Sequence, residues 1–266
     1  MAELALLTLT RTPALYARLL SGLAGQVGAP DYTGVVVNNA SSEDVVRSAV
    51  DAGRWAVLDA GYNTTFSEGN NLAAKVFPDA EWLLLLNDDL VLTAPDFLRR
   101  LWAMRDTPHD VLGAVLAHSD GTVNHAGADF APFPHAHSRP LSDHMGRNDA
   151  LADWVADTVA TVPAVTFAAA LIRRECWNSL GGLDTSYHYG WEDTDFCLRV
   201  MAAGGSAGVV RNAVAVHDEC GTRARSGRDN ADNFNVFRAQ WPDDRLREML
   251  AKYHEEYQGE GLAWLA

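Results

Sequence analysis

Residues 82–89 read WLLLLNDD, a run of five large apolar residues that ends in three polar ones. A short apolar run bounded by polar residues is typical of a strand that is buried on both faces of a parallel sheet. Asn87, Asp88 and Asp89 then stand at the carboxyl end of this strand, where open α/β sheets bind their ligands. The stretch therefore predicts a fold class and also the edge of the sheet that carries the site.

Segments on either side extend this pattern to a whole sheet. Apolar runs alternate with helical stretches, which predicts an α/β fold with a mostly parallel central sheet, flanked by helices, in a single domain. The expected strands are residues 4–9, 34–37, 55–58, 82–86, 111–116, 162–172 and 209–216, and the expected helices are residues 13–23, 42–52, 70–76 and 194–203.

The main domain is expected to cover residues 1–241, followed by a helical tail over residues 242–266. The alternation is cleanest up to about residue 100, which favours a nucleotide-binding half there and an acceptor or catalytic half over residues 101–241. Residues 124–150 are rich in Gly, Pro and His and are predicted to form a long, mobile loop.

Composition narrows the class of partner. The chain has 266 residues, a formal net charge of −14 and a pI of about 4.9, which disfavours broad binding to nucleic acid or anionic lipid. The three cysteines, Cys176, Cys197 and Cys220, are odd in number and widely spaced, and they form no C-x-x-C pair. This usage fits a reducing compartment. No signal peptide is recognised, and the apolar runs are shorter than the about 20 residues of a membrane span. We therefore expect a cytoplasmic protein without a membrane span.

Polar side chains also follow the other predicted strands. Thr8, Thr10 and Arg11 lie at the end of the first strand, Asn38 at the end of the second and His217 at the end of the last. Each residue alone is also what an ordinary turn or surface needs. Because the carboxyl ends of parallel strands meet at one edge, their joint placement predicts a polar site there.

The adjacent carboxylates of Asp88 and Asp89 repel one another unless a cation or water compensates them. Oxygen ligands of this kind suit Mg²⁺ or Mn²⁺, and a nitrogen ligand from His217 would slightly favour Mn²⁺. The alternative is an acidic turn with no ligand.

A second acidic cluster, Glu192, Asp193 and Asp195, lies at the start of the helix expected over residues 194–203. The helix dipole stabilises carboxylates in a first helical turn by about 0.3–1 kcal/mol each. One interpretation is therefore that these acids cap the helix and do nothing else. The alternative is that one of them is a general base towards an acceptor hydroxyl. The spacing leaves both interpretations open.

Six segments, in this order along the chain, resemble the motifs of one family. They are VVVNNASSED (35–44), NTTFSEGNN (63–71), LLLLNDD (83–89), GTVNHAGADF (121–130), residues 172–204 with their G-G-L-D and W-E-D-T-D elements, and the H-x-x-x-G-x-R pattern at 217–223. Over about residues 4–225 the sequence resembles the inverting GT-A glycosyltransferases of family 2, in the rhamnosyltransferase-like branch.

The resemblance implies transfer of a sugar from a nucleotide-diphosphate sugar to a hydroxyl of a glycan, a small molecule or another acceptor. A UDP-sugar is favoured, with dTDP- and GDP-sugars as alternatives. Asp89 and His217 would hold Mn²⁺ or Mg²⁺ on the donor diphosphate, and Asp193 would be the catalytic base beside Glu192. The remaining matched residues would bind the nucleotide-sugar: Thr8, Thr10, Arg11, Asn38, Asn63, Asn70, Asn87, Asp88 and Trp191.

Two positions depart from the family pattern. Asn38 and Asn87 each stand where the family usually has Asp, so they bring a neutral amide to the base and to the metal neighbourhood. An amide both donates and accepts hydrogen bonds, whereas a carboxylate only accepts. Base preference and metal affinity are therefore expected to differ from the family's usual behaviour.

Three rival functions remain. A sugar nucleotidyltransferase would share the carboxylate–metal site, but it would carry a Gly-rich loop where this chain reads TLTRTPAL. A catalytically silent module that binds nucleotide-sugar or glycan would not need both Asp89 and Asp193. A metal hydrolase would need a histidine pair of the H-x-x-x-H or H-x-H kind, and outside the loop over residues 124–150 the sequence has none. The apolar side chains of the tail, Tyr253, Tyr257, Leu262 and Trp264, are a candidate homodimer contact.

Overall fold

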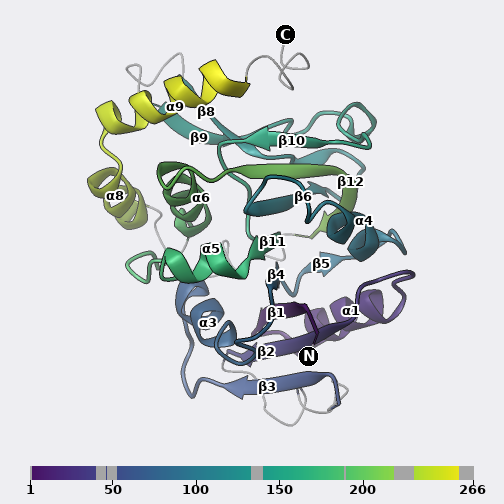
Figure 1. The fold of residues 1–266 in the computed structure, drawn as a ribbon. Coiled ribbons are helices and arrows are strands. Elements are labelled where there is room, and N and C mark those ends of the chain that lie inside the picture. Colours follow the sequence, from purple (N-terminus) through teal and green to yellow (C-terminus); the bar gives the residue numbers. More distant parts are fainter. Residues whose placement is uncertain are drawn as a thin grey trace.

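The computed structural model describes residues 2–39, 46, 53–132, 140–188, 190–218 and 231–257. In this part of the chain a ten-stranded sheet carries helices on both faces, and a separate two-stranded sheet lies near α9 (Asp243–Tyr257) (Figure 1). The predicted α/β class with a central sheet is confirmed.

The strands of the large sheet follow the order β10-β12-β6-β11-β4-β1-β2-β3, with β5 paired to β12 and β7 paired to β6. Six of them, β1, β2, β3, β4, β6 and β12, run in one direction, while β11 runs antiparallel between β4 and β6. Their bounds are β1 Leu4–Thr10, β2 Tyr32–Asn38, β3 Trp55–Asp59, β4 Trp82–Leu86, β5 Leu90–Val91, β6 Val111–Ala117, β7 Val123–His125, β10 Val159–Val162, β11 Ala169–Arg173 and β12 Ala207–His217.

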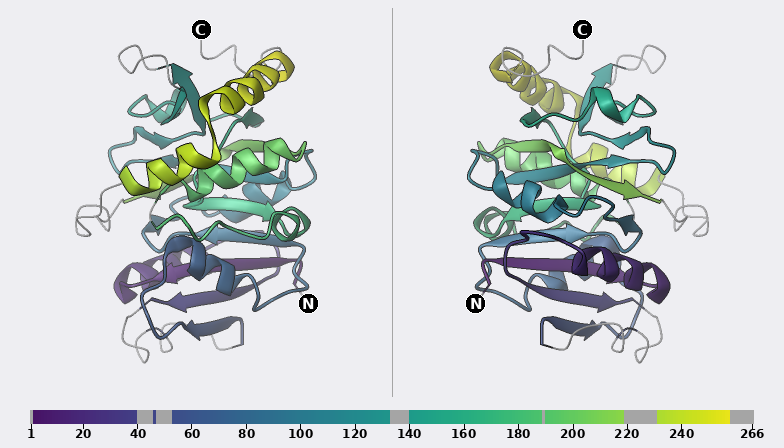
Figure 2. Two further views of the ribbon diagram at one scale, coloured as in Figure 1. Left: turned by 90° about the vertical axis from the view of Figure 1, so that its left-hand side faces the viewer. Right: turned by 90° about the vertical axis from the view of Figure 1, so that its right-hand side faces the viewer.

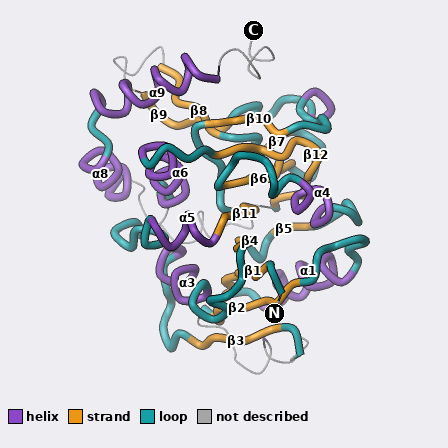
Figure 3. Tube along the Cα trace, viewed as in Figure 1, coloured by secondary structure: helices purple, strands orange, loops and turns teal. Residues whose placement is uncertain are grey.

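Helices cover the two faces of the sheet (Figures 1 and 2). One face carries α1 and α4, and the other carries α3, α5 and α6, with α8 and α9 packed outside α6. The bounds are α1 Pro13–Ala24, α3 Phe66–Ala73, α4 Phe97–Ala103, α5 Arg174–Ser179, α6 Glu192–Ala202 and α8 Ala231–Gln240, and a 3₁₀ turn covers Leu151–Asp153. Figure 3 distinguishes these helices from the strands and loops along the same trace.

Side chains alternate between two cores, one on each face. In β1, Ala5 and Leu7 belong to the cluster beneath α3 and α6, whereas Leu4 and Leu6 belong to the cluster beneath α1 and α4. This period of two is the geometry of an extended strand. Because both faces are covered, residues 4–7 of the strand are all apolar, as the sequence predicts.

Two predicted elements differ from the structure. The apolar run over residues 162–172 is split: β10 ends at Val162, and β11 starts at Ala169 in another part of the sheet. Pro163, which lacks an N–H for a ladder, immediately follows β10. The helix expected over residues 70–76 is α3, which begins earlier because Thr65 and Glu68 form a capping box at its start.

The predicted loop over residues 124–150 is only partly a loop. It contains the end of β7 and the antiparallel pair β8 (Ala128–Pro132) and β9 (Pro140–His144). These strands are too short to produce a clear alternation in the sequence, so the Gly, Pro and His content misled the prediction. Residues 133–139 lie outside the described residues, as does the helix predicted over residues 42–52 except Val46.

The described part of the C-terminal tail, α9, packs against its own chain. Leu246 and Leu250 join Trp241 in a cluster with residues of β8 and α6, and the hydroxyl of the buried Tyr253 donates to the Thr161 carbonyl at 2.7 Å. The homodimer contact stays a prediction, because Leu262 and Trp264 lie outside the described residues. No helix in the described ranges has the length and apolar character needed to cross a membrane.

The capping box of α3 generates a stability prediction with a matched control. The Thr65 hydroxyl accepts from the Glu68 N–H at 3.1 Å, whereas the N-cap Thr12 of α1 makes no such side-chain bond. Thr65→Ala should therefore lower the free energy of unfolding by about 1 kcal/mol, and Thr12→Ala should leave it nearly unchanged. Urea denaturation of the two variants measures the difference, and equal losses would contradict the role of the cap.

Candidate active site

The carboxyl ends of β1, β2 and β3 form one polar row. Thr10 is in register with Asn38, and Asn38 with Asp59. The Asn38 amide donates to the Asp59 carboxylate at 2.7 Å, while Thr8 and Thr10 are buried. The Thr8 hydroxyl has no hydrogen-bond partner among the described residues, which is unusual for a buried polar group. This row is a polar floor at the edge where the sequence places the site.

The two acids after β4 have different surroundings. The Thr10 hydroxyl donates to the Asp88 carboxylate at 2.7 Å, and the Arg11 N–H also donates to it. Burial raises the pKa of Asp88 to about 6; the neighbouring charge of Asp89 acts in the same direction, and the bonds from Thr10 and Arg11 oppose it. Asp88 is thus held against β1, and Asp89 is left for a different partner.

That partner is His217. The β5–β12 pairing puts His217 opposite Leu90, and the His217 Nε2 lies 3.2 Å from Asp89 Oδ1. The other ring nitrogen, Nδ1, lies 3.4 Å from the Asn124 side-chain oxygen. The Arg18 guanidinium lies 3.4 Å from the Asp89 carbonyl and pairs with Asp218. An oxygen and a nitrogen ligand atom therefore converge at the end of β4.

This pair fits a divalent cation that has other ligands of its own. Carboxylate oxygen with imidazole nitrogen suits Mn²⁺, and such ions commonly complete their shell with substrate phosphate and water. Within the described residues no group of three or more His, Cys, Asp or Glu side chains could hold a metal by itself. The donor set fits a metal shared with a substrate, and no all-protein cage is seen among these residues.

Asp193 lies in the first turn of α6, after Trp191, whose backbone is left-handed (φ 75°). One carboxylate oxygen accepts from the Thr194 N–H at 2.7 Å, and the other lies 3.4 Å from the Phe167 N–H. Glu192 beside it is 8% exposed. The helix terminus therefore orients Asp193 towards the segment that precedes β11.

That segment, residues 166–168, connects the parts of the site. The Ala168 carbonyl accepts from the Asn87 N–H at 2.8 Å, and the Thr166 N–H donates to His125 Nε2 at 2.9 Å. Burial, together with the nearby His144 and His217, holds the pKa of His125 well below its usual range. The sequence pointed to His125 only as one residue of the segment GTVNHAGADF and of a His-rich loop.

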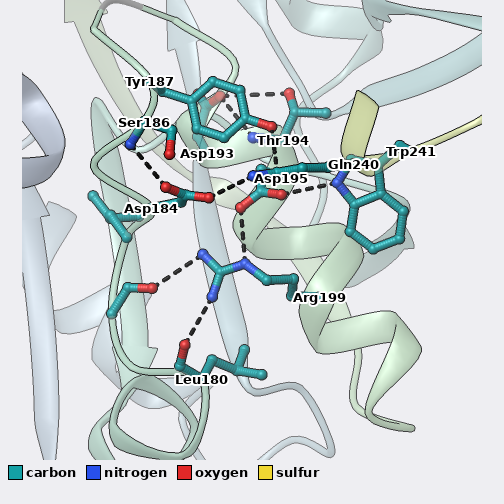
Figure 4. A network of polar contacts seen from close by, with 12 residues as sticks. Leu180, Asp184, Ser186, Tyr187, Asp193, Thr194, Asp195, Arg199, Gln240 and Trp241 are labelled. Carbon is teal, nitrogen blue, oxygen red and sulfur yellow. Dashed lines mark hydrogen bonds and ion pairs between the residues drawn. The ribbon is translucent and has the colours of Figure 1, made fainter. Parts of the chain in front are cut away.

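The third acid of the cluster, Asp195, has a structural role that the sequence did not reveal (Figure 4). Asp195 is 1% exposed, pairs with Arg199 at 2.8 Å and accepts from the Trp241 indole at 2.8 Å. Tyr187 donates to Gln240 beside it. The network joins α6 to the end of α8. Asp195 therefore stabilises the packing of these helices, whereas Asp193 faces the segment before β11.

The remaining predicted residues are spread around this site. Asn70 is buried and donates to the Phe66 carbonyl of its own helix, whereas Asn63 and Arg11 are exposed. The Trp191 ring packs 4.6 Å from that of Phe237, so part of its surface is already covered. Asn71, which the sequence did not single out, exchanges two hydrogen bonds with the Leu183 backbone.

The pKa of Asp88 makes the stability of metal-free protein depend on pH. It is about 6 in the folded chain and 3.8 ordinarily, so between these values the folded chain keeps a proton that the unfolded chain has lost. The resulting stabilisation is present at low pH and is lost as pH rises through about 6. The free energy of unfolding of Asp88→Asn, taken relative to that of wild type, should therefore rise by on the order of 2 kcal/mol from pH 4 to pH 7.

Urea titrations in EDTA at the two pH values measure this difference, with the exposed Asp31→Asn as the matched control. A pH-independent difference between wild type and Asp88→Asn would contradict the raised pKa.

Comparisons with known proteins point to one kind of fold. No family model matches the sequence. The chain is 28% identical over 242 residues to the O-antigen biosynthesis protein RfbC of Myxococcus xanthus, covering 86% of this chain and 18% of that protein. It is 33% identical over 139 residues to the uncharacterized protein y4gI of Sinorhizobium fredii, covering 50% of this chain and 15% of the other. The chain thus spans less than a fifth of either relative.

Solved structures agree over most of the chain. The mannosyltransferase PcManGT of Pyrobaculum calidifontis, in complex with GDP-Man and Mn²⁺, has a TM-score of 0.59 at 18% identity, over 84% of this chain and 59% of that one. GalNAc-T7 with UDP, GalNAc and Mn²⁺ has a TM-score of 0.61 at 12% identity, over 82% and 44%. TarS of S. aureus has a TM-score of 0.55 at 17% identity, over 89% and 63%. The chain therefore belongs to the proteins with the GT-A glycosyltransferase fold.

Proposed function

We propose that this protein is an inverting, metal-dependent glycosyltransferase that uses a nucleotide-diphosphate sugar as donor. One observation carries the proposal: Asp193, on α6, and Asn87, beside the Asp89–His217 pair, both bind the backbone of residues 167–168. A carboxylate suited to act as base is thereby linked directly to a site suited to hold a diphosphate. The similarity to an O-antigen biosynthesis protein and the fold shared with a mannosyltransferase, each over most of the chain, support the same activity.

The reaction that fits these groups is a single displacement. Asp193 accepts the proton of the acceptor hydroxyl, whose oxygen forms the new bond to the anomeric carbon, and the nucleoside diphosphate leaves with the electrons of the broken bond. Attack from the face opposite the leaving group inverts the anomeric configuration. Glu192, next to Asp193, helps to orient the acceptor, and Thr194 and Phe167 hold the base through their N–H groups.

The donor diphosphate is negatively charged and meets a protein of net charge −14. Mn²⁺ or Mg²⁺, when bound, supplies positive charge to the leaving diphosphate. Asp89 and His217 would hold it, while Asp88 is bonded to Thr10 and Arg11 on the β1 side. Arg18, which lies against the Asp89 backbone, adds a further cation at this end of the sheet.

The Asn38–Asp59 bond supports a preference among bases. Because the Asn38 amide nitrogen donates to Asp59, the amide orientation is fixed and the amide oxygen is the acceptor. Uracil, thymine and guanine each present a ring N–H to such an acceptor, whereas the corresponding nitrogen of cytosine is itself an acceptor. A UDP-sugar is the favoured donor, with dTDP- and GDP-sugars as alternatives.

Two further expectations belong to the same proposal. We expect the protein to work in the cytoplasm, because its cysteine usage fits a reducing compartment. We also keep a homodimer as a proposal that sedimentation would test. The acceptor is a hydroxyl of a glycan, a small molecule or another molecule, and an acceptor screen would have to define it.

Donor binding can be tested by thermal shift with UDP, dTDP, GDP and CDP, each with Mn²⁺ and with EDTA. A ligand at about 100 times its Kd adds about 2.7 kcal/mol to the folded state, so a true donor base gives a clear shift. We expect a shift with UDP that vanishes in EDTA and is smallest or absent for CDP. Asn38→Leu should remove the discrimination against CDP, and a CDP shift as large as that of UDP in wild type would contradict the base argument.

The catalytic base can be separated from a helix cap by a matched pair. Asp193→Asn should lower kcat by about 10²–10⁴-fold while leaving the UDP and Mn²⁺ shift intact. Glu175→Gln removes an exposed acid from the first turn of α5 and should leave kcat unchanged. Near-normal turnover of Asp193→Asn would exclude Asp193 as the base, and nucleotide binding without any turnover in wild type would favour a silent module.

A further inference from the structure

The segment GTVNHAGADF, residues 121–130, contributes a buried histidine to which the mechanism above gives no role. His125, at the end of β7, is 2% exposed. Its Nε2 lies 2.9 Å from the Thr166 N–H, and its ring meets that of His144 edge-on at 4.7 Å. A backbone N–H can only donate, so Nε2 accepts through its lone pair. The single N–H proton of the neutral ring is then on Nδ1.

The residues held by this bond are those that touch the reacting groups. Phe167, next to Thr166, donates its N–H to Asp193, and Ala168 accepts from the Asn87 N–H. Leu86, the residue before Asn87, is held by the β4–β11 pairing, where it is in register with Ala169. The bond from Thr166 to His125 is therefore a side-chain anchor, beside the Phe167–Asp193 contact, at the amino end of the segment.

The other ring nitrogen of His125 shows that packing alone does not account for this residue. Nδ1 is buried and has no hydrogen-bond partner within the described ranges. A buried donor without an acceptor destabilises the folded chain, so packing around the ring gives no reason for a side chain that carries Nδ1 here. Locally unfavourable choices of this kind are expected at functional sites.

We propose that His125 is a positioning residue for sugar transfer, which acts by accepting the Thr166 N–H and so fixing the Phe167 N–H on Asp193. The proposal rests on the proposed function, because it takes Asp193 as the base. His125 touches neither substrate in this scheme. Its effect is on the orientation of the base and not on binding of the donor.

Three substitutions at one position test the acceptor. His125→Gln places an oxygen near the position of Nε2, His125→Asn places one nearer the position of Nδ1, and His125→Leu supplies none. Hydrogen exchange of the Thr166 and Phe167 amides and kcat from nucleotide release are measured on all three. We expect faster exchange and a kcat lowered by about 10- to 100-fold in the Asn and Leu variants, since displacement by about 1 Å can cost 10²-fold.

The Gln variant should keep slow exchange and a kcat within a few fold of wild type. The thermal shift with UDP and Mn²⁺ should be unchanged in all three, because the donor side is held by the β4–β11 pairing. Rescue by Gln but not by Asn is the signature of an acceptor at Nε2. A role in packing alone would not produce that order.

His109 is the matched control. It is also buried, at 6% exposure, and is bonded to Thr107 and Thr161 close to the start of β6, away from the carboxyl edge. His109→Gln and His109→Leu should change the melting temperature but neither kcat nor exchange at Thr166. If His125→Leu does not fold, the comparison of Gln with Asn still decides.

Slow exchange in every folded His125 variant would overturn the proposal, because the buried Phe167 ring would then be sufficient to hold the segment. Faster exchange with unchanged kcat would overturn it as well. If wild type transfers no sugar and Asp193→Asn behaves like wild type, it is the proposed function that fails. The exchange measurement alone then shows whether His125 anchors Thr166, and unchanged exchange would reject that too.

Discussion

The site depends on one reversal of chain direction. β11 runs antiparallel between the parallel strands β4 and β6, with Ala169 opposite Leu86. Its amino end therefore lies beside the carboxyl end of β4, and the residues that lead into it, 166–168, arrive at the edge where Asp88 and Asp89 stand. A parallel β11 would deliver its carboxyl end there instead. The backbone groups that meet Asp193, Asn87 and His125 would then be at the opposite edge.

Local sequence patterns predict much of the fold but not this reversal of direction. The apolar composition of runs such as Leu4–Thr10 and Trp82–Leu86 predicts buried strands. The polar residues at their carboxyl ends indicate one edge of the sheet. The run over residues 162–172 has the same composition, yet it serves two strands that lie apart in the sheet. Direction is decided by pairing with β4, β6 and β12, which are distant in sequence, so only Pro163 marks the break locally.

Much the same holds for the groups around the site. Asp89 and His217 are each recognisable as polar residues after a strand, but their 3.2 Å approach depends on the antiparallel pairing of β5 with β12. His125 gives no local signal of its burial, because a histidine in a short strand is indistinguishable from a surface one in the sequence. Asp195 looks like its neighbours in the sequence and is distinguished only by Arg199 and Trp241.

The acidic start of α6 shows why capping and catalysis need not be alternatives. Asp193 uses one oxygen on the Thr194 N–H, as a residue in a first helical turn commonly does, and directs the other to the Phe167 N–H across the site. Free N–H groups at a helix terminus favour an ionised carboxylate, and an ionised carboxylate is also what proton transfer requires. The same electrostatics that stabilises the helix end therefore prepares the base. An acid that only capped α6 would not need a second contact with the segment that joins it to the end of β4.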